Sequence, residues 1–183
     1  TREKTRNPFG VNLITVAPSF KQQVEVVVRE RCPFVFFAGS IPSGRDIAEV
    51  KAAGLNVVCF APVLALARRL IKQGVDALVI EGNEAGGHIG PVSTSVLAQE
   101  FLLSVTEVPV FVAGGIGTGE IIAQYLSLGA AGVQLGTRFV VAEECIAHPR
   151  FKEAFVRASA RDAMPTTQFD PSLPTIPVRA ILN

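Results

Sequence analysis

A glycine-rich segment around His88 carries the side chains best suited to chemistry. It runs from Glu81 to Gly90 with the sequence EGNEAGGHIG and directly follows the apolar run ALVI of residues 77–80. The apolar run predicts a strand, and the glycines, including Gly86 and Gly87, let the backbone pass close to a flat ligand. Histidine takes up and releases protons near neutral pH, so we predict that His88 is catalytic rather than a residue that only caps backbone carbonyls.

Two carboxylates in this segment, Glu81 and Glu84, are open to several interpretations. A carboxylate at the end of a strand can orient a ligand hydroxyl or the imidazole of His88. Stabilisation of the loop, or simple solvation, explains these two side chains about as well.

Two further glycine-rich loops also follow predicted strands, VFVAGGIGTG at 110–119 and GVQLGTRF at 132–139. Backbone N–H groups at such turns, together with a helix N-terminus, form an anion site suited to phosphate. Glycine loops after the last two strands are the usual phosphate site of a (β/α)8 barrel. We therefore predict phosphate binding there, with tight turns as the plainer alternative; Arg138 fits a phosphate contact and a place at the barrel rim equally well.

The remaining reactive side chains favour structural roles. Cys32, Cys59 and Cys145 form no CxxC pair, so we expect reduced thiols that pack as small apolar groups. His148 precedes a helical stretch and is expected to be structural. The sequence contains no spacing typical of a metal site, a Ser-His-Asp triad or a Walker loop, so no metal is predicted.

Composition narrows the class of protein. Among 183 residues, 17 are basic and 16 acidic, which gives no electrostatic reason to expect nucleic acid or an anionic membrane as a partner. Mean hydropathy is +0.39, yet no apolar run approaches the roughly 20 residues of a membrane helix. The polar start TREKTR does not resemble a signal peptide. We expect a cytoplasmic protein acting on a small molecule.

Short apolar runs alternate with segments of helical period along the whole chain. Strands are predicted at 9–15, 34–38, 56–60, 77–81, 108–113 and 132–135, and helices near 19–31, 44–53, 62–73, 94–104 and 119–128. Ser19 and Gln22 have the spacing of a capping box. Gly54, Gly74 and Gly129 each follow a helix, where a left-handed cap uses glycine.

This alternation predicts an α/β fold with a parallel sheet, organised as a single domain over residues 1–183. Six strands fit an open doubly wound sheet or an incomplete barrel, since a full (β/α)8 barrel has about 250 residues. The phosphate-type loops favour a TIM-type (β/α)8 barrel that lacks its first two βα units and contains strands 3–8.

Three segments resemble the nitronate monooxygenase (2-nitropropane dioxygenase) family, which includes the flavin-dependent enoyl-acyl-carrier-protein reductases. They are EAGGHIG at 84–90, AGGI at 113–116 and GVQLGTRF at 132–139, and PFGVNL at 8–13 resembles the family's third barrel strand. The resemblance implies non-covalently bound FMN with His88 beside the flavin ring. By position it further implies cofactor contacts from Glu81, Gly86, Gly87, Gly114, Gly115, Gln134, Gly136 and Thr137. Glu81 stands where the family often has another polar residue, frequently glutamine.

The resemblance implies two reactions. As a nitronate monooxygenase, the protein oxidises alkyl nitronates or nitroalkanes with O2 to carbonyl compounds and nitrite, and His88 removes the α-proton of a neutral nitroalkane. As an enoyl reductase, it takes electrons from NAD(P)H and reduces an enoyl thioester. The tail DPSLPTIPVR at 170–179 resembles proteins described as nitronate monooxygenases, and we favour the first reaction.

Two hypotheses lie outside this family chemistry. A barrel without two of its units exposes sheet edges and apolar surface, which favours association with another chain, such as a homo-oligomer, and is compatible with a non-catalytic binding module. A phosphate-binding isomerase or lyase shares the fold, but such enzymes usually place a lysine or carboxylate at a strand end.

Overall fold

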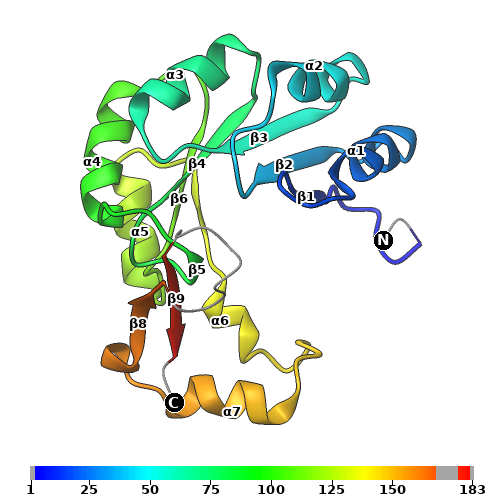
Figure 1. The fold of residues 1–183 in the computed structure, drawn as a ribbon. Coiled ribbons are helices and arrows are strands. Elements are labelled where there is room, and N and C mark those ends of the chain that lie inside the picture. The colour runs from blue at the N-terminus through cyan, green and yellow to red at the C-terminus, as the bar shows by residue number, and fades with distance from the viewer. Residues whose placement is uncertain (1–2, 168–176, 182–183) are drawn as a thin grey trace. The chain divides into compact units, whose positions relative to one another are not determined.

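The computed structural model describes residues 3–167 and 177–181, whose helices and strands are drawn in Figure 1. These residues form two compact units. The first unit contains the chain up to Val79 together with Val105–Pro109, and the second contains Ile80–Ser104 and the chain from Val110 onward. Strands alternate with helices along the chain, which confirms the α/β class.

In the first unit, four parallel strands lie in the order β1 (Gly10–Ile14), β2 (Phe34–Ala38), β3 (Asn56–Phe60) and β4 (Ala77–Glu81). Val35 pairs with Val11 on one side and Val57 on the other, and both Val35 and Val57 are fully buried. Apolar β-branched runs form such strands because both faces of a parallel sheet are covered.

The helices of the first unit are α1 (Phe20–Arg29), α2 (Gly44–Ala52) and α3 (Leu64–Lys72). Helix α1 buries Phe20, Val24 and Val27, whose spacing places them on one helical face. Helix α2 begins with a capping box in which Ser43 and Asp46 each bond the other's backbone N–H.

The second unit starts within β4 and contains a parallel pair of strands, β6 (Val110–Ala113) and β7 (Gly132–Gln134). Its helices are α4 (Thr94–Ser104), α5 (Gly119–Ser127), α6 (Thr137–Val140) and α7 (Pro149–Arg157), followed by a 3-10 turn at Ala160–Asp162. A separate antiparallel sheet has the order β5 (Gly87–His88), β9 (Val178–Ile181) and β8 (Ala163–Thr166). The sequence pattern did not predict these three strands.

Two local predictions need correction. Ser19 precedes α1 but makes no capping hydrogen bond; its hydroxyl accepts from Nε2 of Gln23 at 2.9 Å. Its backbone, with φ −88° and ψ 7°, lacks the extended conformation usual for a capping residue. The prediction of buried cysteines holds for Cys32 and Cys59, whereas Cys145 is only half-buried.

None of the described helices has both the length and the apolarity needed to span a bilayer. No group of three or more His, Cys, Asp or Glu side chains in the described ranges is placed to hold a metal ion.

Candidate active site

The ends of β4 and β6 meet around the first residue of α4 in the second unit. A Cβ placed on Gly82 would overlap the backbone of Thr94, so only glycine allows this approach. Thr94 is fully buried, and its hydroxyl donates to the carbonyl oxygen of Ala113 at 3.4 Å. The loop after β4 is therefore fixed next to the loop after β6.

Gly114 and Gly115, predicted to bind phosphate, lie directly against the loop that carries His88. Gly114 has φ +97°, and a Cβ there would lie 2.9 Å from the backbone nitrogen of Ala85. Gly115 has φ +73°, and a Cβ there would lie 3.0 Å from the Cβ of Glu84. Both positions require glycine because of their left-handed backbone and because of this close contact.

The loop after β7 joins the same group. A Cβ on Gly86 would lie 3.5 Å from the Thr137 hydroxyl, which is ordinary contact. Gly136, immediately before α6, has no atom within 4 Å of its Cβ position, and Gln134 ends β7 with an exposed side chain. The structure thus gathers the three predicted glycine loops in one unit.

The backbone donors of these loops are available for a ligand. In the described part of the chain, the N–H groups of Gly115, Ile116 and Gly136 donate no hydrogen bond. Unpaired donors after two neighbouring strands, β6 and β7, suit an anionic group such as phosphate.

His88 lies in the short strand β5, rather than in an irregular loop as the sequence predicted. It pairs with Val178 of β9, and its neighbour Gly87 pairs with Arg179. The N–H of Ile89 donates to the carbonyl oxygen of Pro177 at 2.9 Å. This pairing fixes the backbone while the side chain of His88 stays exposed.

Glu81 is the last residue of β4 and is only partly exposed. Burial raises the pKa of its carboxyl from 4.5 to about 7. A carboxyl with a pKa near 7 can carry a proton at neutral pH, which makes Glu81 a second candidate for proton transfer.

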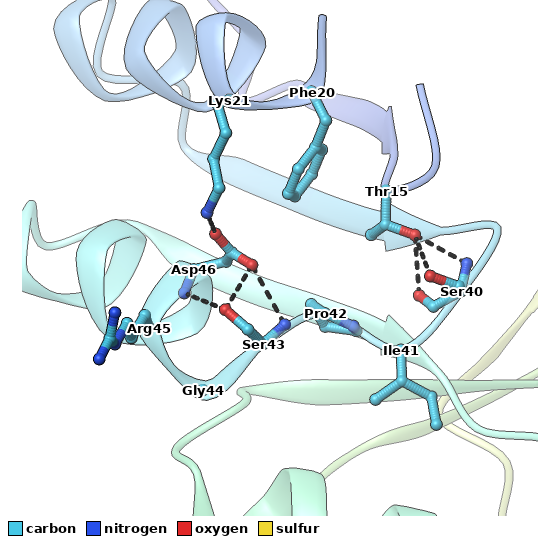
Figure 2. A pocket seen from close by; sticks show the side chains of 10 residues that line it. All are labelled: Thr15, Phe20, Lys21, Ser40, Ile41, Pro42, Ser43, Gly44, Arg45 and Asp46. Carbon is cyan, nitrogen blue, oxygen red and sulfur yellow. Dashed lines mark hydrogen bonds and ion pairs between the residues drawn. The ribbon is translucent and has the colours of Figure 1, made fainter. Parts of the chain in front are cut away.

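A cavity of about 840 Å³ in the first unit lies between the end of β1 and the start of α2 (Figure 2). Lys21 is ion-paired with Asp46, and the Ser43 hydroxyl donates to the Asp46 carboxylate at 2.6 Å. Burial acts to raise the pKa of Asp46, but the hydrogen bonds from Lys21 and Ser43 outweigh it and lower the pKa. Asp46 takes part in the N-terminal cap of α2 and in the ion pair with Lys21, so we assign it a structural role.

Two other side chains follow their predicted structural roles. Burial raises the pKa of the Cys59 thiol to about 12, so this thiol stays protonated at neutral pH. His148 caps α7, where its Nδ1 accepts from the N–H of Arg150 at 3.2 Å.

Residues 2–182 match the model of one family, described as nitronate monooxygenase. The chain belongs to the nitronate monooxygenase family.

This family member is similar to other proteins of known sequence or structure. FabK from Thermotoga maritima is 41% identical with a TM-score of 0.91, over 98% of this chain and 56% of its own. A (3aS,4S,5R,7aS)-5-hydroxy-7a-methyl-1-oxo-octahydro-1H-indene-4-carboxyl-CoA dehydrogenase of Mycobacterium tuberculosis (strain ATCC 25618 / H37Rv) is 36% identical, over 91% of this chain and 47% of that protein. A probable nitronate monooxygenase of Staphylococcus aureus (strain Newman) is 30% identical, over 87% and 48%. The chain spans about half the length of these curated relatives.

Arg179 of this nitronate monooxygenase family member contacts the segment that carries His88, and the sequence did not predict this contact. Its guanidinium donates to the carbonyl oxygen of Asn83, a residue 96 positions away in sequence. No local pattern signals such a contact; only its place in the tail that resembles the family pointed to this segment. Residues 170–176 of that tail lie outside the described residues.

Proposed function

We propose that this chain is part of an FMN-dependent oxidoreductase that oxidises alkyl nitronates or nitroalkanes with O2, giving carbonyl compounds and nitrite. The observation that carries the proposal is an exposed His88 held by strand pairing in the same unit as three glycine-rich strand exits. The proposal includes the expectation that residues 1–183 form a single domain and supply strands 3–8 of a (β/α)8 barrel.

The residues at the strand exits fit FMN. The family is flavin-dependent in general, and unpaired N–H groups at Gly115 and Gly136 suit a phosphate. Thr137 offers a hydroxyl beside Gly136. Gly86 and Gly87, with no atom closer than 3.5 Å to their Cβ positions, leave room for a flat ring. Gly114 supports the phosphate loop, and Glu81 and Gln134 supply polar groups at the ends of β4 and β7.

His88 performs the proton transfer in this proposal. Its exposed imidazole removes the α-proton of a neutral nitroalkane, a step that a preformed nitronate does not need. Bound FMN would supply the redox chemistry, the transfer of electrons from the nitronate to O2. Glu81, whose carboxyl has a pKa of about 7, is the second candidate for proton transfer at this site.

Reduction of an enoyl thioester with NAD(P)H is the second candidate. It is supported by the 41% identity to FabK, an enoyl-acyl-carrier-protein reductase, which exceeds the 30% identity to the probable nitronate monooxygenase. Under this alternative His88 positions the nucleotide or the thioester, or donates a proton.

An anaerobic titration of the purified, flavin-loaded protein separates the two candidates. We expect the visible flavin band to be bleached by a nitronate and to be unaffected by NAD(P)H. Rapid bleaching by NAD(P)H, followed by recovery on addition of an enoyl thioester, would replace the proposal by the reductase. Failure to bind FMN at all would favour a non-catalytic binding module.

A further inference from the structure

Arg179 of β9 contacts the His88 segment through both its backbone and its side chain. Its backbone pairs with Gly87, next to the pair formed by His88 and Val178. Its side chain turns to the other end of the segment, where Nε and Nη2 donate to the carbonyl oxygen of Asn83 at 3.1 and 2.7 Å. The remaining nitrogen, Nη1, donates to the carbonyl oxygen of Ala163 in β8.

The peptide of Asn83 is held on both sides. Its N–H donates to the carbonyl oxygen of Val92 at 2.8 Å, and the turn around it closes through the bond from the N–H of Ala85 to the carbonyl oxygen of Gly82 at 3.2 Å. The Asn83 carbonyl is anchored by Arg179. Residues 83–89 are thus fastened at one end by this side chain and at the other by the β5–β9 pairing.

All three hydrogen bonds of the guanidinium go to backbone carbonyls, and no ion pair of Arg179 occurs among the described residues. The planar guanidinium therefore acts here by donating hydrogen bonds to carbonyl oxygens and not by forming an ion pair. Hydrogen bonds from a charged donor are stronger than neutral ones. A lysine in the same place can reach one carbonyl but cannot reproduce the fork.

We infer that Arg179 is a positioning residue for His88: it fixes the backbone of residues 83–89 so that the imidazole is presented in one orientation. The inference rests on the proposed function, in which His88 removes a proton from the neutral nitroalkane. Reaction rates depend steeply on such placement, since a misplacement of about 1 Å can cost about 10²-fold.

The test compares Arg179→Met, which keeps the length of the side chain but removes its donors, with Arg179→Lys. His88→Ala serves as the positive control, and Arg161→Met, at an exposed position of the same unit, controls for the lost charge. For each variant we would measure flavin content, kcat with a neutral nitroalkane, kcat with its preformed nitronate, and hydrogen exchange of residues 82–90 in the apoprotein.

We expect Arg179→Met to lower kcat for the neutral nitroalkane by roughly 10- to 100-fold and to leave kcat for the nitronate and the flavin content unchanged. Hydrogen exchange of residues 82–90 should become faster, Arg179→Lys should fall between, and Arg161→Met should match the wild type. If Arg179→Met fails to fold, the same comparison is made with Arg179→Lys.

Equal losses with both substrates would overturn the inference, because a purely structural role affects them alike. Full activity of Arg179→Met with the neutral nitroalkane, where His88→Ala has lost most of its turnover, would overturn the inference and leave the proposed function standing. Full turnover of the neutral nitroalkane by His88→Ala would overturn the proposed function and the inference with it.

Discussion

Glu84 and Gly115 are in direct contact, so that a Cβ built on Gly115 would lie 3.0 Å from the Cβ of Glu84 and 3.1 Å from its Oε2. This contact joins the loop after β4, which carries His88, to the loop after β6, which is predicted to bind phosphate. A substitution at Gly115 therefore changes the geometry of both parts of the proposed site.

Gly115→Ala should lose bound FMN and lower the free energy of unfolding by about 1–3 kcal/mol, because of the left-handed backbone and the contact with Glu84. Gly54→Ala is a matched control, since Gly54 has φ +74° but no atom within 4 Å of its Cβ position. Flavin content and urea unfolding measure both effects. Equal behaviour of the two variants would show that the contact with Glu84 contributes nothing.

Gly136→Ala should abolish FMN binding while the fold stays intact. The Cβ position of Gly136 is open, with φ −115°, so alanine meets neither protein atoms nor backbone strain. A methyl group there occupies the space that we assign to phosphate. The control is Gly90→Ala, at a position that is equally open but does not belong to the loops at 110–119 and 132–139. Normal flavin content in Gly136→Ala, measured by absorbance after gel filtration, would remove Gly136 from the cofactor site.

His88→Ala should retain FMN and lower turnover of a neutral nitroalkane by about 10²–10⁴-fold, the usual contribution of a general base. Turnover of the preformed nitronate should persist because that substrate has already lost its proton. Nitrite release in parallel assays measures both rates. A parallel loss with the two substrates would show that His88 acts in binding or folding instead.

The sequence predicted the parts of the fold that depend on local pattern. The strands Phe34–Ala38, Asn56–Phe60 and Ala77–Glu81 agree residue for residue with the structure, because their apolar runs end abruptly at turn residues. The glycines after β4 and β6 were predicted to be important because they directly follow these apolar runs. Their close contacts with Thr94 and Glu84 have no local signal in the sequence.

The antiparallel sheet was not predictable in this way. Its central strand β9 lies about 90 residues after Gly87–His88, with which it pairs. A Gly-His dipeptide has no strand propensity of its own. Long-range pairing, rather than local preference, makes β5 a strand. The contact of Arg179 with Asn83 depends on that pairing, so the sequence did not predict this contact either.

The pKa of Glu81 leads to a pH-dependent stability that can be tested on the apoprotein. Burial raises the pKa of this carboxyl from 4.5 to about 7 in the folded state. Between these values the folded chain binds a proton that the unfolded chain has released, so the free energy of unfolding falls as pH rises from 4.5 to 7. The decrease is complete above pH 7 and amounts to at most about 3 kcal/mol.

Glu81→Gln should remove this decrease, because an amide does not ionise. We therefore expect the variant to be more stable than the wild type at pH 8 and close to it at pH 4.5, as measured by urea unfolding at both values. Glu100→Gln, which alters an exposed carboxylate on α4, controls for the change in net charge. If the wild type and Glu81→Gln respond to pH alike, Glu81 is ionised at neutral pH in the folded state, and its candidacy for proton transfer fails.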